Sequence, residues 1–188
     1  MDQRAAGDPI PPDCGLIEVR VTDLNRLFNA MDPSPFREKD LDPNAEAFIV
    51  GWARDMPGDV RLGLLIYVER PMGTSDEVGV VREAVHEFFT ERARAARREV
   101  RQLLRVGRVS LMIGLAFLAV SIVGGDILAG TERSGRLGGV LQESLLIGGW
   151  VAMWRPLEIF LYDWWPIRAE ARLFDRLGSM LVRIAYTG

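Results

Sequence analysis

Apolar side chains fill one continuous stretch of this chain, from Val109 to Gly125, and no charged residue interrupts it. Ile127 and Leu128, beyond Asp126, extend it to about twenty residues, the length of α-helix that crosses a hydrocarbon core of roughly 30 Å. A buried helix of a water-soluble domain is usually shorter, at about 10 to 14 apolar residues, and keeps some polar positions. The pattern therefore predicts a transmembrane helix.

A second apolar segment runs from Val140 to Trp165, although Arg155, Glu158 and Asp163 follow its uncharged part, Ser144 to Trp154. Taken alone, this segment is ambiguous between a span and a buried helix. Beside the first span it is expected to cross back, because the arginines after residue 165 then lie on the same side as those before residue 109. The two segments together predict a two-helix transmembrane hairpin over residues 109–165.

The segment before the first span is amphipathic and basic. Thr74 and Glu77 match a capping box, which marks the start of a helix, and only Gly107 interrupts the pattern before the span. We expect one long helix that begins in residues 74–108 and continues into the bilayer. Its arginines are expected to contact anionic lipid headgroups, at about 1 kcal/mol for each side chain near the surface. These arginines are Arg97, Arg98, Arg101, Arg105 and Arg108.

Residues 166–188 carry apolar side chains at three- and four-residue steps, with arginines between them. This pattern predicts an amphipathic helix that lies on the cytoplasmic headgroup surface or packs on the long basic helix. Pro166 is expected to make the corner between the second span and this helix. The apolar positions are Leu173, Phe174, Leu177, Met180, Leu181 and Ile184.

Residues 16–73 predict a small α+β head. The alternation from Leu16 to Val21 is typical of a strand, and Thr22 or Asp23 caps a short helix after it. A second strand is expected over Val60 to Val68, apolar enough to be buried on both faces. Residues 1–15, rich in Pro, Asp and Gly, are expected to be disordered and dispensable for folding.

A second helix of the head is predicted to start at Asp42 and Pro43, because Asp supplies a capping oxygen and Pro suits the first helical position. The helix ends near Met56 to Gly58. Its apolar face consists of Ala45, Phe48, Ile49 and Trp52.

Charge asymmetry predicts the orientation. Seven arginines lie between Arg92 and Arg108, whereas the loop between the two spans has only Arg133 and Arg136. The positive-inside rule then puts both termini in the cytoplasm of a bacterial inner membrane and the loop, about residues 129–139, outside. No cleavable signal peptide is expected, since charges and prolines occupy the first thirty residues.

Composition divides the chain into an acidic head and a basic membrane region. Residues 1–91 hold 18 acidic and 9 basic side chains, and residues 92–188 hold 8 acidic and 14 basic ones. A basic stripe beside a span most simply faces anionic lipid, so nucleic acid is not expected as a partner. The single cysteine, Cys14, excludes internal disulfides and cysteine-based zinc sites.

Two segments carry a resemblance. They are Leu27 to Asp42, with the sequence LFNAMDPSPFREKDLD, and Trp154 to Pro166, with the sequence WRPLEIFLYDWWP. They resemble a group of uncharacterised bacterial inner-membrane proteins of similar length. The resemblance implies a bacterial source and a hairpin topology, and it implies no activity and no functional residue.

Candidate chemistry is sparse. Acidic residues of the head could offer oxygen ligands to a divalent cation, but they lack the spacing of a calcium loop, and capping explains two of them. His86 has no nucleophile at a known spacing, so it is expected to be solvated or lipid-facing, and no catalytic, metal or cofactor residue is assigned. The acidic residues are Asp32, Glu38, Asp40, Asp42 and Glu46.

Arg155 and Glu158 are the better candidates, because they are three residues apart on a helix and can form a pair inside the membrane. The alternative is that they anchor the cytoplasmic interface, within an aromatic belt. Small residues at four-residue spacing, such as Ser110 with Gly114, are expected to let the helices pack closely. The belt consists of Trp150, Trp154, Trp164 and Trp165.

Three functions stay open. The first is a membrane-anchored, non-enzymatic adaptor or accessory subunit, whose partners are the anionic bilayer and either another protein or further copies of itself. The second is an oligomeric channel or transporter that uses Arg155, Glu158 and Glu143, since two helices alone supply too few walls for a pore. The third is a membrane-bound, metal-dependent hydrolase that uses the acidic head.

Overall fold

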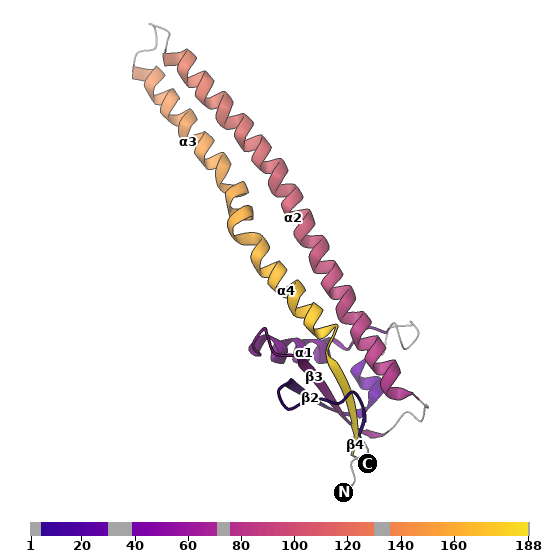
Figure 1. The fold of residues 1–188 in the computed structure, drawn as a ribbon. Coiled ribbons are helices and arrows are strands. Elements are labelled where there is room, and N and C mark those ends of the chain that lie inside the picture. Colours follow the sequence, from indigo (N-terminus) through magenta and orange to yellow (C-terminus); the bar gives the residue numbers. More distant parts are fainter. Residues whose placement is uncertain (1–4, 30–38, 71–75, 130–135, 188) are drawn as a thin grey trace. The chain divides into compact units, whose positions relative to one another are not determined.

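A computed structural model describes residues 5–29, 39–70, 76–129 and 136–187. The chain is mostly helical with one small sheet (Figure 1). It divides into two compact units, one of Met1–Ala95 with Glu170–Gly188 and the other of Ala96–Ala169. The elements in chain order are β1 (Ala5–Gly7), β2 (Gly15–Asp23), the 3-10 helix η1 (Leu24–Leu27), α1 (Pro43–Asp55), β3 (Leu62–Arg70), α2 (Glu77–Ala129), α3 (Arg136–Glu158), the π-helix η3 (Ile159–Asp163), α4 (Trp164–Leu177) and β4 (Leu181–Tyr186).

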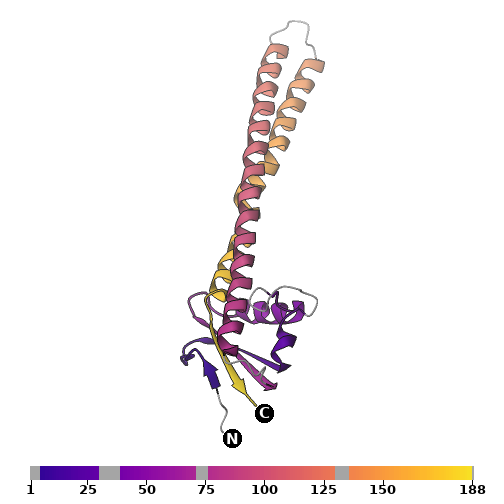
Figure 2. The ribbon, with the colours of Figure 1, turned by 90° about the vertical axis from the view of Figure 1, so that its right-hand side faces the viewer.

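The sheet has the order β1-β4-β3-β2. β2, β3 and β4 are parallel, with Glu18 beside Leu65 and Leu65 beside Arg183. β1 runs antiparallel to β4, so the first and last strands of the chain lie side by side (Figure 2). The predicted strands at residues 16–21 and 60–68 are confirmed as β2 and β3.

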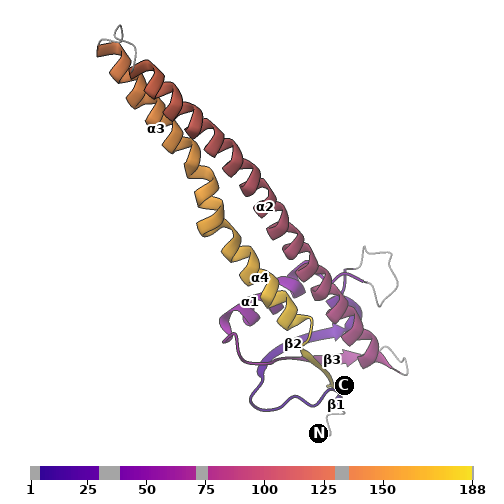
Figure 3. The same cartoon turned by 45° about the horizontal axis from the view of Figure 1, so that its top comes forward.

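Both connections between parallel strands cross to the next strand in the same direction. Such connections are right-handed in almost all proteins, so α1 and the parts of α2 and α4 in this unit lie on the same face of the sheet (Figure 3). The core beneath them consists chiefly of Ile17, Leu64, Ile66, Val182 and Ile184 from the strands and Ile49, Val85, Phe89, Phe174 and Leu177 from the helices.

The prediction of one amphipathic helix over residues 166–188 is wrong for its last part. The helix ends at Leu177, and residues 181–186 form β4 at the centre of the sheet. Val182 and Ile184 alternate as a strand requires, but the same residues also fit helical steps, so only the partner strand β3 decides between them. The apolar face of α4 lies in the head, where Phe174 stacks on Phe89 of α2, the second of the two expected packings.

Pro166 makes no corner, because it falls in the first turn of α4 and the helix continues through it.

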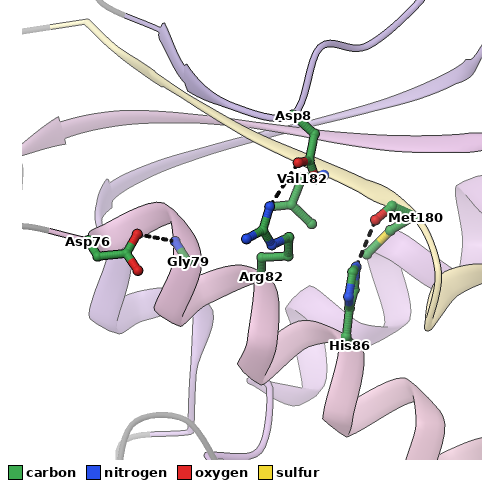
Figure 4. Close-up of polar contacts among 7 residues, drawn as sticks. All are labelled: Asp8, Asp76, Gly79, Arg82, His86, Met180 and Val182. Atoms are coloured by element: carbon green, nitrogen blue, oxygen red, sulfur yellow. Dashed lines mark hydrogen bonds and ion pairs between the residues drawn. The ribbon is translucent and has the colours of Figure 1, made fainter.

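The prediction that residues 1–15 are disordered is wrong for residues 5–15, while residues 1–4 lie outside the described ranges. β1 pairs with β4, and Gly7 adopts a φ of +117°, where a Cβ would lie 2.6 Å from the carbonyl oxygen of Val182. The Asp8 carboxylate accepts hydrogen bonds from the backbone N–H of Val182 at 3.2 Å and from Arg82 at 2.8 Å (Figure 4). Ile10 then lies on Gly63 of β3. We name residues 8–14 the strap.

α2 is one continuous helix from Glu77 to Ala129, as the sequence predicts. Asp76 caps it by accepting a hydrogen bond from the N–H of Gly79 at 3.0 Å (Figure 4), and the predicted cap, Thr74, lies outside the described residues. The carboxylate of Glu77 accepts a hydrogen bond from the Tyr186 hydroxyl at 2.9 Å. Burial and this carboxylate raise the pKa of Tyr186 to about 12.

In the second unit α3 packs antiparallel to α2. Gly107 lies against Ile159, Gly114 against Met153 and Gly149 against Leu118. Because glycine has no side chain, the two backbones approach closely at these levels. Pro156 has no N–H for the carbonyl of Ala152, and a Cβ at Gly114 would lie 3.2 Å from that oxygen.

Within the described part of the chain, α2 is the one helix long and apolar enough to cross a membrane. Only 17% of its most apolar stretch is buried in the protein. α3 does not meet the same criterion, so the second span of the hairpin stays a prediction.

Candidate functional surfaces

An ion cluster follows the apolar part of α3. Arg155 donates to Glu158 at 2.9 Å, which confirms the expected pair, and its guanidinium also lies 3.4 Å from the carboxylate of Asp163. Eight residues make more than two turns of an α-helix, so Asp163 would be displaced around the axis from Arg155. The π-helical turn η3 has more residues per turn and brings Asp163 within reach. The spacing of eight residues between Arg155 and Asp163 does not predict this contact for an α-helix.

The register between α2 and α3 fixes the level of this cluster along the helix pair. Since Gly107 lies against Ile159 and Gly114 against Met153, Glu158 is level with about residue 108 of α2. Arg155 lies one turn further along, about level with Met112. The pair therefore lies where the arginine-rich part of α2 ends and the apolar part begins.

The predicted headgroup arginines of α2 all have exposed side chains. Arg101 and Arg108 donate from Nε to the carbonyls of Arg97 and Leu104, one turn back, so their guanidiniums lie along the helix surface. Arg97, Arg98 and Arg105 complete the surface.

Of the predicted tryptophan belt, Trp150, Trp154 and Trp165 are exposed. Trp164 is half-buried and donates from its indole to the carbonyl of Phe160 at 2.8 Å. The guanidinium of Arg168 lies 5.6 Å from the centre of the Trp164 ring, in cation–π geometry. An indole beside a guanidinium is the pairing that suits the boundary between lipid and water.

The acidic cluster predicted from the sequence does not assemble among the residues that the structure describes. Asp42 caps α1 by accepting from the N–H of Asn44, and Glu46 pairs with Arg92 at 2.8 Å. Asp32 and Glu38 lie outside the described residues, and no group of three potential metal ligands occurs within them.

His86, expected to be solvated or lipid-facing, is half-buried in the head. One of its ring nitrogens, Nε2, lies 2.7 Å from the carbonyl oxygen of Met180, and this contact links α2 to the residue before β4 (Figure 4).

α1 exposes an aromatic pair that belongs to its predicted apolar face. The helix buries Ile49, Val50 and Ala53, so Ile49 is the one residue of the predicted face that is buried. Phe48 and Trp52 are left 44% and 53% exposed, with ring centres 6.1 Å apart. Two adjacent exposed aromatic rings are typical of a protein-binding surface.

The face of the sheet away from the helices, which we name the outer face, carries side chains in rows that cross the strands. The registers put Leu16, Gly63 and Leu181 in one row, Glu18, Leu65 and Arg183 in the second, Arg20, Tyr67 and Ala185 in the third, and Thr22, Glu69 and Thr187 in the last. Arg20 lies 5.3 Å from the centre of the Tyr67 ring. The strap covers the first row, and a groove of about 410 Å³ between the strap and the sheet opens toward Leu65, Tyr67 and Arg183.

Comparisons with known proteins give no match to a protein-family model, to a curated protein or to a solved structure. The function is therefore inferred from the surfaces described above.

Proposed function

We propose that the protein is a non-enzymatic adaptor or accessory subunit anchored in a bacterial inner membrane, with a cytoplasmic head that binds a partner protein. The observation that carries the proposal is the apolar surface of the second unit. Met112 and Val120 of α2 are each 70% exposed, and Trp150 of α3 is 73% exposed. An apolar surface that extends along both helices is unstable in water and stable in lipid.

The charges beside this apolar surface support the orientation. The exposed arginines of α2 precede it and the Trp164–Arg168 pair follows it, so both chain segments on the head side carry groups that suit anionic headgroups. This arrangement favours a hairpin with both termini in the cytoplasm.

The topology of the head supports a scaffolding role. β3 leads into α2 and α4 leads into β4, so the membrane unit is inserted between two neighbouring strands of one sheet. Two chain segments therefore connect the head to the membrane unit. The exposed pair Phe48 and Trp52 offers a partner an aromatic surface on the head.

The two alternatives have less support. A channel would use Arg155 and Glu158 deep in the bilayer, whereas their level beside Arg108 favours the interface, where Arg155 can extend its charge to water. A metal-dependent hydrolase would need the acidic residues of the head to converge, whereas Asp42 and Glu46 already bond other groups.

The test is purification of the full chain from its own membranes in mild detergent, with quantitative mass spectrometry of co-purifying proteins. We expect a companion in near-stoichiometric amount, lost in the double substitution of Phe48→Ser with Trp52→Ser and retained in Asp55→Asn at the exposed end of the same helix. Purification without a companion, or retention of the companion in the double variant, contradicts the proposed role of this surface.

A further inference from the structure

The outer face of the sheet is covered by the strap along its first row, and by no described helix along the other rows. Sheets of parallel strands almost always have both faces covered, and here the described helices lie on one face only. Leu16 is 38% exposed, while Leu65, Tyr67 and Leu181 are half-buried although they lie on neighbouring strands. The outer face therefore has an apolar surface that a second protein surface would bury.

We propose that this second surface is the outer face of another copy of the same chain, related by a two-fold axis that runs parallel to the strands. Two sheets that pack face to face align their strands within about 30°, and a closed dimer uses the same surface on both copies. An axis above β3 brings β2 of one copy opposite β4 of the other and leaves each row at its own height.

Under that symmetry the rows of the outer face are complementary. In the second row Glu18 meets Arg183 of the second copy, and Arg183 meets Glu18, so two ion pairs form at once. Neither side chain has an ion-pair partner within the part of the chain that the structure describes. Leu65 and Tyr67, which lie on the axis, meet their own copies and supply the apolar centre.

The same symmetry suits a protein whose copies share one bilayer. Within the head, α2 starts beside Tyr186 at the end of β4 and passes His86 beside Met180, just before β4 begins. α4 also ends just before β4. Both connections to the second unit thus leave from the amino ends of the parallel strands, and a two-fold axis along the strands keeps these ends on the same side in both copies.

Pairing of β2 edges, the other way to join two sheets, is less suitable. β2 is an edge strand of nine residues, and antiparallel pairing with its own copy would extend the sheet. That arrangement reverses the strands, so the connections to the two membrane units would leave in opposite directions. It would also leave the outer face uncovered.

Charge reversal tests the proposal. The protein mass of the full chain in mild detergent, from light scattering over a dilution series, is expected to be that of a dimer. Glu18→Arg alone and Arg183→Glu alone should each raise the dissociation constant by about tenfold or more, because each change sets like charges opposite one another. The two changes together restore opposite charges and should return the constant to near the wild-type value. Glu87→Arg and Arg94→Glu, exposed on α2 at the opposite face of the sheet, are the controls and should have no effect.

A substitution at Glu69 is expected to lower the dissociation constant of the dimer instead of raising it. The axis brings Glu69 opposite Glu69 of the second copy, so Glu69→Gln should tighten the dimer. A monomeric wild type, a dimer that tolerates either single reversal, or a double reversal that stays as weak as the single ones would each overturn the proposal. Circular dichroism of every variant separates loss of the dimer from loss of the fold, and rescue by the double variant excludes misfolding as the cause.

Discussion

The Tyr186 hydroxyl joins the last strand to the first turn of α2. It donates to Glu77, whose side chain is almost fully buried, and burial together with the carboxylate raises the pKa of Tyr186 to about 12. The unfolded chain has a tyrosine pKa near 10. The neutral phenol is therefore the form that the fold favours.

This shift predicts a pH dependence of stability. Below about pH 10 Tyr186 is neutral in both states, and between about pH 10 and 12 only the unfolded chain ionises, so the free energy of unfolding falls as the pH rises through this window. Tyr186→Phe should remove this loss and should cost about 1 to 2 kcal/mol at neutral pH. Denaturant unfolding of the detergent-solubilised chain at several pH values measures both effects. Tyr162→Phe, at an exposed tyrosine of the second unit, is the control, and an equal alkaline loss in the Tyr186 variant would disprove the assignment.

The contacts of Asp8 predict a second effect on the free energy of unfolding. Its carboxylate bonds both the N–H of Val182 and Arg82, which holds β1 beside β4. Asp8→Ala should lower the free energy of unfolding by about 1 to 3 kcal/mol, because the half-buried N–H loses its acceptor. Asp13→Ala, at an exposed position of the strap, should be close to neutral. Equal stability of the two variants would contradict the role of Asp8 and would support the disordered tail that composition predicts.

At the scale of elements, the sequence predicted those helices whose ends depend on neighbouring residues. Asp23 and Asp42 cap η1 and α1 as expected, and both accept from the N–H two residues on. β1 and β4 were not predicted, because each strand forms only beside a partner that is far away in sequence. β4 pairs with β3, and the whole of α2, α3, η3 and α4 lies between them in the chain.

The face of α1 shows a second limit. The predicted apolar stripe and the observed one share Ile49, and a helix with apolar residues at positions 48, 49, 50, 52 and 53 can bury either side. Only the position of the sheet decides which side of α1 is buried. The remainder, Phe48 and Trp52, became an exposed surface that the sequence could not distinguish from core.

Glycine contacts predict the behaviour of the helix pair α2 and α3. A side chain at Gly114 would meet Met153 and the carbonyl of Ala152, whereas nothing lies within 4 Å of a Cβ at Gly124. Gly114→Leu should therefore push the helices apart, and Gly124→Leu should not, although both changes raise helix propensity equally. Electron paramagnetic resonance between spin labels at Leu115 and Val151 measures the separation. The same distance in both variants would show that the close packing has no role.

At the scale of the whole molecule, the two units differ in the surface that they expose. The head buries its apolar side chains around Phe89 and Phe174, whereas the second unit exposes most of its own, including Met112 and Trp150. This difference is what the proposed function requires of a chain placed where water and lipid meet. The positions of the arginines and tryptophans at the boundary support this arrangement.

The topology of the anchor is the remaining test, because only α2 meets the criterion for a span in the described residues. The charge asymmetry predicts that the connection between α2 and α3 lies outside and the head lies inside. In a Cys14→Ser background, a cysteine introduced by Ser134→Cys should react with a membrane-impermeant maleimide in intact cells. One introduced by Asp59→Cys, exposed in the head, should react only after the membrane is opened. Protection of both positions in intact cells would mean that α3 does not return across the bilayer as a span, and the hairpin would be replaced by a helix pair bound at the cytoplasmic surface.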